Sequence, residues 1–177
     1  ALGVGDRARF RRLGLFDAPY VEESAEIVGP TAPARSLVRE AAGRAAVLLE
    51  NDGTLPLRQD ARLLLAGPYA TSSDLLGAWT QSFAAPAGSV ADEMVDRCGP
   101  DRVAVLPGTG FFDIDEAGIE EAAEAAKSVD VAVVFVGEPS TISGEAASRS
   151  DIRLPGAQER LITRIAATRT PTVVVIV

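Results

Sequence analysis

The stretch Val131-Ala-Val-Val-Phe-Val136, followed by Gly137 and Glu138, decides the fold that we expect. Six apolar residues in a row, mostly β-branched or aromatic, are typical of a strand that is buried on both faces. The polar loop after this strand carries Glu138, Glu145, Arg149 and Asp151. Because open α/β sheets bind their ligands beyond the carboxyl ends of the strands, this loop is the first place to expect chemistry.

Similar apolar runs recur along the chain and alternate with segments of helical period. Strands that are continuously apolar and separated by helices indicate βαβ units with helices on both faces of the sheet. We therefore predict an α/β protein, a three-layer α/β/α sandwich with a mostly parallel sheet. The expected strands are 62–67, 102–106, 130–136 and 172–177, and the expected helices are 34–47, 89–97, 115–128 and one that Pro155 opens at its first position.

Local signals define two of these helices in more detail. Ser89 is expected to cap the helix that ends before Gly99 and Pro100. The helix over residues 115–128 is amphipathic, so its apolar residues should face the sheet and its glutamates the solvent. The residues expected to point inward are Ile119, Ala122, Ala123 and Ala126.

The chain reads as two regions. Residues 1–32 lack a sustained period and end in a breaker-rich segment, so we expect a lead-in or linker. Residues 33–177 carry the regular pattern and are expected to form the sandwich domain. Because the sequence stops on the apolar strand at 172–177, we expect further strands, or another domain, to belong beyond it.

Composition excludes several classes of protein and of site. The chain of 177 residues has a net charge of −8, which argues against nucleic acid and against anionic membranes as partners. It contains no His, which excludes Ser-His-Asp catalysis, and its single Cys98 excludes an internal disulfide. The N-terminus lacks the pattern of a signal peptide, and the compartment is left open.

Signatures of cofactors and metals are missing from the sequence. There is no Walker-type phosphate loop, and the Gly-Pro-Tyr segment at 67–69 does not match the dinucleotide fingerprint. The Gly-Thr-Gly segment at 108–110 is best interpreted as a tight turn. With no His and one Cys, a zinc site is not expected. We therefore expect neither a cofactor nor a metal.

Five motifs, in order along the chain, resemble those of glycoside hydrolase family 3. The segment 36–57, SLVREAAGRAAVLLENDGTLPL, is similar to the entry of that family's second domain, although Glu50 stands where the family usually has Lys. The resemblance extends to four shorter segments on either side. These are LGLFDAPY at 13–20, LAGP at 65–68, LGAW at 76–79, and SGEAASR at 143–149 with LPGAQ at 154–158.

The resemblance implies a retaining β-glycosidase, most often a β-glucosidase acting on terminal β-linked glucosyl residues. In this family a (β/α)₈ barrel domain supplies an Asp nucleophile, and the sandwich supplies the acid/base. Retaining chemistry needs two carboxyl groups about 5–5.5 Å apart. No Asp of this chain matches the nucleophile motif, so the expected partners are a barrel domain of the same enzyme and a β-glucoside or oligosaccharide.

The resemblance also assigns candidate roles to individual residues. Glu145 matches the Glu of the family's SGEA loop and is the candidate acid/base, with Glu138 as its competitor. Glu138, Arg149 and Asp151 are expected to support the loop, Arg149 as an anchor and Asp151 as the cap of the next turn. Trp79 and Phe83 are candidate sugar-binding aromatics, with core or interface packing as the alternative.

Two further functions stay open. The chain could be a carbohydrate-binding or interaction domain without catalysis, or an unrelated flavodoxin-like ligand-binding or regulatory domain. The SGEAASR segment separates the enzyme and the carbohydrate-binding domain from the flavodoxin-like domain, since a regulatory domain has no need of this segment. A barrel-encoding segment in the same reading frame would separate the enzyme from the binding domain.

Overall fold

The computed structural model describes residues 4–20, 22, 31–80, 88–114 and 116–177. The chain divides into two units, residues 1–48 and 49–177. The first unit holds α1 (Val4–Arg12) and α2 (Ala32–Ala45). Helix α1 lies in the lead-in, where the sequence shows no helical period. Helix α2 corresponds to the helix expected at 34–47 and begins two residues earlier, because Thr31 caps it by accepting a hydrogen bond from the Ala34 amide.

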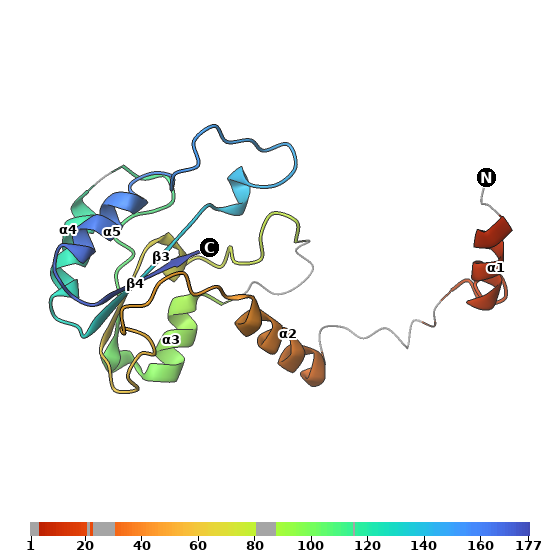
Figure 1. Cartoon of the computed structure of the whole chain (residues 1–177), viewed down its shortest axis with the longest axis horizontal. Coiled ribbons are helices and arrows are strands. Elements are labelled where there is room, and N and C mark those ends of the chain that lie inside the picture. Colours follow the sequence, from red (N-terminus) through yellow and green to blue (C-terminus); the bar gives the residue numbers. More distant parts are fainter. Residues whose placement is uncertain (1–3, 21, 23–30, 81–87, 115) are drawn as a thin grey trace. The chain divides into compact units, whose positions relative to one another are not determined.

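The second unit is built on a sheet of four parallel strands (Figure 1). The strands are β1 (Leu63–Ala66), β2 (Val103–Val105), β3 (Val131–Val136) and β4 (Thr172–Ile176). They lie in the order β2-β1-β3-β4, and every neighbouring pair is parallel. The prediction of an α/β fold with a parallel sheet is therefore confirmed.

Alternate residues of the strands pack on opposite faces of the sheet, which gives the three layers. One face carries Leu64, Val134 and their pleat neighbours, and it packs against α4 (Ala117–Ala126) and α5 (Gln158–Ala166). The other face carries Leu63, Val133 and their neighbours, and it packs against α3 (Val90–Cys98). Burial on both faces explains why β1 and β3 are apolar at every position.

Of the four helices predicted from the sequence, all but one begin where their sequence signals indicate, within two residues. Ser89 caps α3 in a reciprocal capping box with Asp92, and the four inward residues expected in α4 are all buried. The expectation that Pro155 opens the last helix is wrong. Pro155 lies in a bend and α5 begins at Gln158, because Gly156 has a φ of +62°, which a right-handed helix cannot include.

The carboxyl end of β1 lies against β3 at a glycine. Gly67 has a φ of +86°, and a Cβ at this position would lie 2.0 Å from the Phe135 carbonyl oxygen. Only glycine therefore allows the chain to turn into the short 3₁₀ helix η2 (Pro68–Ala70) at this point. Two further 3₁₀ turns are η3 (Pro100–Arg102) and η4 (Ser140–Ile142).

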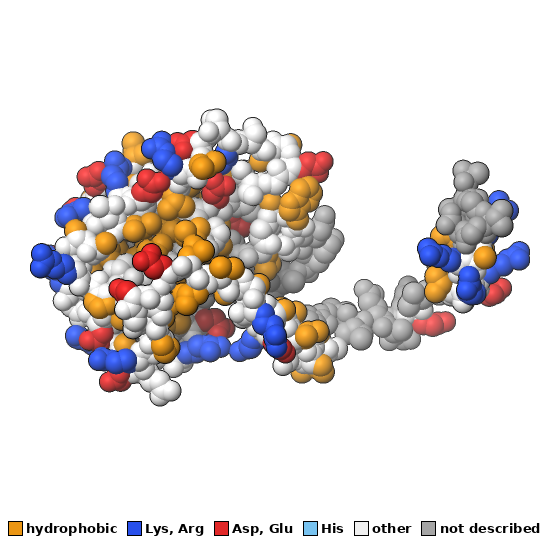
Figure 2. All heavy atoms as spheres, in the orientation of Figure 1, with side chains coloured by type: hydrophobic (Ala, Val, Ile, Leu, Met, Phe, Trp, Pro, Cys, Tyr) orange, Lys and Arg blue, Asp and Glu red, His pale blue; other side chains and the backbone are white. Residues whose placement is uncertain are grey.

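Strand β4 forms one edge of the described sheet and is only partly covered. Val174 and Ile176 are exposed, the latter at 66%. Figure 2 shows hydrophobic side chains gathered in the middle of the visible face of the second unit, with charged side chains around its margin. Among the described residues, no helix is both long and apolar enough to cross a membrane.

Candidate functional site

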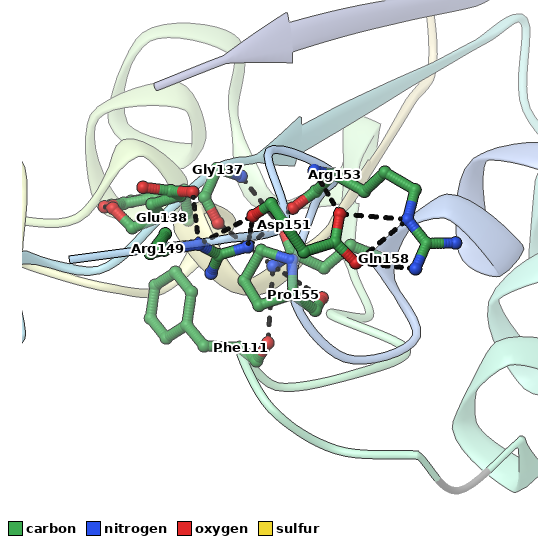
Figure 3. A network of polar contacts seen from close by, with 9 residues as sticks. Phe111, Gly137, Glu138, Arg149, Asp151, Arg153, Pro155 and Gln158 are labelled. Carbon is green, nitrogen blue, oxygen red and sulfur yellow. Dashed lines mark hydrogen bonds and ion pairs between the residues drawn. The ribbon is translucent and has the colours of Figure 1, made fainter. Parts of the chain in front are cut away.

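The candidate site is the loop of residues 137–157, which joins the carboxyl end of β3 to α5. Its root is fixed by Gln158, which is fully buried. The Gln158 side-chain oxygen accepts a hydrogen bond from the Gly137 amide at 2.9 Å, and its nitrogen donates to the Gly137 carbonyl at 3.0 Å. The same nitrogen lies 3.2 Å from the Pro155 carbonyl and 3.4 Å from that of Phe111. One neutral side chain thus joins both ends of the loop to the end of the sheet (Figure 3).

An ion pair joins the two arms of the loop above this root. The Arg149 guanidinium lies 3.1 Å from the Glu138 carboxylate, and the two side chains are 22% and 37% exposed. Arg149 also donates to the backbone carbonyls of Asp151, at 2.7 Å, and Arg153, at 2.8 Å. The side chain of Glu138 is therefore directed at Arg149 and not at the tip of the loop (Figure 3).

Asp151 closes the turn that follows. Its carboxylate accepts from the Arg153 amide at 3.0 Å and from the Arg153 guanidinium at 2.6 Å. The hydrogen bonds from Arg153, together with the smaller effect of the positive charges of Arg153 and Arg149, lower the pKa of Asp151 from 3.8 to about 2. The carboxylate is therefore ionised across the ordinary pH range, which suits an anchor and not a proton donor.

Glu145 lies at the tip of the loop and is exposed. The Ala147 amide donates to the Gly144 carbonyl at 3.2 Å, which closes a turn with Glu145 and Ala146 at its centre. Ala146 has a φ of +63°, a conformation that costs a residue with a Cβ about 1 kcal/mol. Strained backbone of this kind is concentrated at functional loops, so its position next to Glu145 is consistent with a functional carboxylate.

The loop tip lies against the segment that carries Trp79. Gly144 has a φ of +101°, and a Cβ there would lie 2.8 Å from the Ala78 Cβ and 3.9 Å from Cε2 of Trp79. Trp79 is 72% exposed. The structure therefore brings Trp79 next to the residue that precedes Glu145. Phe83, the second candidate aromatic, lies outside the described residues.

Two hollows are lined by the loop. One, of about 510 Å³, lies between residues 146–151 and Phe112, and Pro155 also lines it. The other, of about 450 Å³, lies between Glu138 and Ser143 on the loop and Asp74 and Ala78 on the segment after β1. Within the described part of the chain, no cluster of three or more His, Cys, Asp or Glu residues could hold a metal ion.

Two contacts of the loop were not predicted from the sequence. The Tyr69 hydroxyl donates to the Glu138 carbonyl at 2.6 Å, and the Asp74 carboxylate accepts from the Ser140 amide at 2.7 Å. The only signal for Tyr69 is its position three residues after a buried strand. Neither contact was predictable from the spacing of residues, because each joins a side chain to backbone 66–69 residues away.

Comparisons with known proteins agree on one family. Residues 46–177 match the model of the glycosyl hydrolase family 3 C-terminal domain. The chain is 32% identical over 168 residues to a probable exo-1,4-beta-xylosidase of Aspergillus terreus, with 93% of the chain and 22% of that protein covered. It is 31% identical over 194 residues to a periplasmic beta-glucosidase of Salmonella typhimurium, with 93% of the chain and 25% of that protein covered.

Solved structures show the same likeness in three dimensions. A beta-glucosidase from Listeria innocua in complex with isofagomine superposes with a TM-score of 0.81 at 30% identity, over 96% of this chain and 24% of that one. The same enzyme in complex with glucose superposes with a TM-score of 0.80 at 31% identity, over 94% of this chain and 23% of that one. The chain thus spans about a quarter of the length of these relatives. By sequence and by fold, it belongs to glycoside hydrolase family 3, as the resemblance predicted, and carries that family's C-terminal domain.

Proposed function

We propose that this chain supplies the acid/base half of a retaining β-glycosidase that hydrolyses terminal β-linked glucosyl residues, with Glu145 as the acid/base. The observation that carries the proposal is the position of Glu145, exposed at the tip of a loop whose root is bound to the carboxyl end of β3. That edge of an open α/β sheet is where ligands bind.

The second carboxylate of the pair is proposed to come from a (β/α)₈ barrel domain of the same enzyme. Retaining hydrolysis needs a nucleophile about 5–5.5 Å from the acid/base. Glu138 is a poor candidate for that nucleophile, because it is paired with Arg149. In the proposed reaction, Glu145 first protonates the leaving glycosidic oxygen as the nucleophile attacks the anomeric carbon. It then takes a proton from the water that hydrolyses the covalent intermediate.

The proposed sugar specificity draws on two observations. The chain shares 31% identity with a beta-glucosidase whose structure was solved in complex with glucose. Trp79 exposes its ring beside the loop tip, where it could stack on the apolar face of a sugar or of the leaving group. Phe83 is proposed to add a second ring to the same subsite. Because relatives named as xylosidases are equally similar, hydrolysis of matched aryl β-glucosides and β-xylosides tests this part directly.

The flavodoxin-like alternative is disfavoured by the same sheet edge. The strand order β2-β1-β3-β4 matches the flavodoxin-like order, in which ligands bind at the switch between β1 and β3. In this chain Tyr69 lies in η2, three residues after β1, is 2% exposed, and donates a hydrogen bond to the Glu138 carbonyl after β3. The side chain of Tyr69 therefore bridges the ends of the two strands between which a flavin or nucleotide would bind.

Glu145→Ala tests the assignment of the acid/base. The chain is combined with a separately produced barrel domain of the family and assayed on aryl β-glucosides with good and poor leaving groups. We expect the variant to lower kcat/KM about 10²- to 10⁴-fold on the poor leaving group, where protonation matters most, and far less on the good one. The chain without a barrel should be inactive.

Glu121→Ala is the matched control, because Glu121 is an exposed glutamate on α4 at a distance in sequence from the loop. It should leave both substrates unaffected. Equal turnover of Glu145→Ala and the parent on all substrates would overturn the assignment. Binding of a β-glucoside without turnover by any combination would instead favour a carbohydrate-binding domain that has lost catalysis.

A further inference from the structure

The first arm of the Glu145 loop is held by two side chains from the segment that follows β1. The Tyr69 hydroxyl lies 2.6 Å from the Glu138 carbonyl oxygen, and Asp74 Oδ2 lies 2.7 Å from the Ser140 amide nitrogen. Both contacts fall between the end of β3 and the turn that carries Glu145. The same segment reaches the tip, where Ala78 and Trp79 lie against Gly144.

Tyr69 is itself fixed in the core of the second unit. It is 2% exposed, and its ring lies edge-on to that of Phe111, with the centroids 4.8 Å apart. It belongs to the apolar cluster on the α3 face of the sheet. The hydroxyl is therefore the end of a side chain that cannot move without disturbing the core, which makes it a rigid reference point for the loop.

The direction of the hydrogen bond follows from its partner. A carbonyl oxygen only accepts, so the Tyr69 hydroxyl must donate and must stay protonated. Burial raises the pKa of the Tyr69 phenol above its usual value of 10.0, and the negative charges of Asp74 and Glu138 raise it further. The donor is thus retained at neutral pH and below.

From these contacts we infer that Tyr69 is a positioning residue for Glu145, with Asp74 as its second support. The inference rests on the proposed function. Tyr69 fixes the position of Glu138 relative to the end of β3, and Asp74 fixes the start of η4. Together they determine where the turn at residues 144–147 lies. Misplacement of a reacting group by about 1 Å costs on the order of a hundredfold in rate, so a small shift of this arm is sufficient to affect the acid/base.

Tyr69→Phe tests the inference, because it removes one oxygen and keeps the buried ring. Tyr20→Phe is the matched control, since it makes the same chemical change at a side chain that is 89% exposed in the first unit. The first measurement is hydrogen exchange of the backbone amides of residues 138–147 in the chain. Loss of one neutral hydrogen bond is expected to raise their exchange about five- to tenfold, while the amides of β1 and β3 keep their rates.

The second measurement is the leaving-group dependence of kcat/KM with the barrel domain, with Glu145→Ala assayed beside it. Tyr69→Phe is expected to lower turnover about five- to tenfold on a poor leaving group and to spare a good one, because only protonation is impaired. A role in stability alone would lower both equally. Asp74→Ala should act in the same direction, and Asp74→Asn, which keeps an acceptor for the Ser140 amide, should restore the parent behaviour.

The outcomes separate the two proposals. Unchanged exchange in both Tyr69→Phe and Asp74→Ala would overturn the positioning role. A leaving-group effect for Glu145→Ala without one for Tyr69→Phe and Asp74→Ala would also overturn it and would leave the proposed function standing. The absence of a leaving-group effect for Glu145→Ala would overturn the proposed function, and the inference with it. If Tyr69→Phe also raises exchange in the strands, the Asp74 pair decides, because Asp74 lies outside both apolar clusters.

Discussion

The loops that follow β3 and β2 leave the same edge of one sheet, yet they differ in whether their buried polar side chains are hydrogen-bonded. After β3, both amide atoms of the buried Gln158 side chain are bonded to backbone. After β2, Thr109 is also buried, at 8% exposure, but within the described part of the chain its hydroxyl has no hydrogen-bond partner. Satisfied buried groups specify one geometry, so the contrast indicates that a fully bonded buried side chain fixes the root of the loop carrying Glu145, whereas the Thr109 side chain adds no such bond to the loop after β2.

Among the substitutions that test this contrast, Gln158→Leu is expected to lower the free energy of unfolding most. It leaves the Gly137 amide and carbonyl without their partners in the core, which should lower the free energy of unfolding by about 3 kcal/mol. Denaturant unfolding followed by circular dichroism measures the loss. Gln59→Leu is the control, because Gln59 is exposed and its backbone carbonyl, not its side chain, accepts the bond from Arg102. Similar losses of stability in both variants would contradict the prediction that the buried hydrogen bonds of Gln158 stabilise the fold.

Arg149→Leu removes the ion pair that joins the two arms of the same loop. Arg149 is mostly buried, and it holds Glu138 together with two backbone carbonyls, so we expect a loss of about 1 kcal/mol. Hydrogen exchange should rise in residues 138–153 before it rises in the sheet. Arg164→Leu serves as the reference, since its pair with Glu120 is half exposed and ion pairs of that kind contribute little. If the two variants lose equal stability, the ion pair of Arg149 is no more than a surface contact.

The fold was predictable because its decisive signals are local. Continuous apolar runs at β1 and β3 predicted strands buried on both faces, and Ser89 marked the start of α3 through its own side chain. The start of α5 was mispredicted because Gly156 adopts a left-handed conformation, with a φ of +62°, which prevents a continuous helix from starting at Pro155. Helix α1 was missed because only three basic residues in its last turn distinguish it from a loop.

The position of the loop that carries the candidate residues could be predicted from the sequence, but the contacts that hold the loop could not. Glu138, Glu145 and Arg149 fall after a buried strand, and that alone located the loop. The contacts that hold the loop join side chains to backbone atoms far away in the sequence, as Tyr69 does with the Glu138 carbonyl. A backbone carbonyl is present at every residue, so sequence carries no mark of which one is used. The geometry of a loop anchored in this way has to come from the structure.

Lowering the pH is expected to weaken the contacts of Asp151, the exposed anchor of the loop, and not those of the neutral side chain of Gln158 at its buried root. Because the Asp151 pKa is lowered to about 2, the stability that its ionised form contributes is complete above the ordinary value near 3.8 and is lost as the pH falls toward 2. A carbon NMR titration of the Asp151 carboxyl should show this midpoint. In Arg153→Met the midpoint should rise toward 3.8, and in Arg164→Met it should stay where it is. A midpoint near 3.8 in the parent would mean that the contact between Asp151 and Arg153 does not persist in solution.

Thr109→Val should have the smallest effect of all. The change keeps the shape of the side chain and removes a buried hydroxyl without a described partner, so stability should stay constant or rise by about 1 kcal/mol. Thr170→Val is the matched comparison, because the Thr170 hydroxyl donates to the Ala126 carbonyl at 2.9 Å. That variant should lose about 1 kcal/mol in the same denaturant series. If Thr109→Val loses as much as Thr170→Val, the Thr109 hydroxyl has a partner in solution, and the contrast with the bonded Gln158 side chain is lost. If it does not, the difference between two identical substitutions identifies the Thr109 hydroxyl as an unsatisfied group in the loop after β2, whereas the buried amide of Gln158, at the root of the loop after β3, is fully bonded.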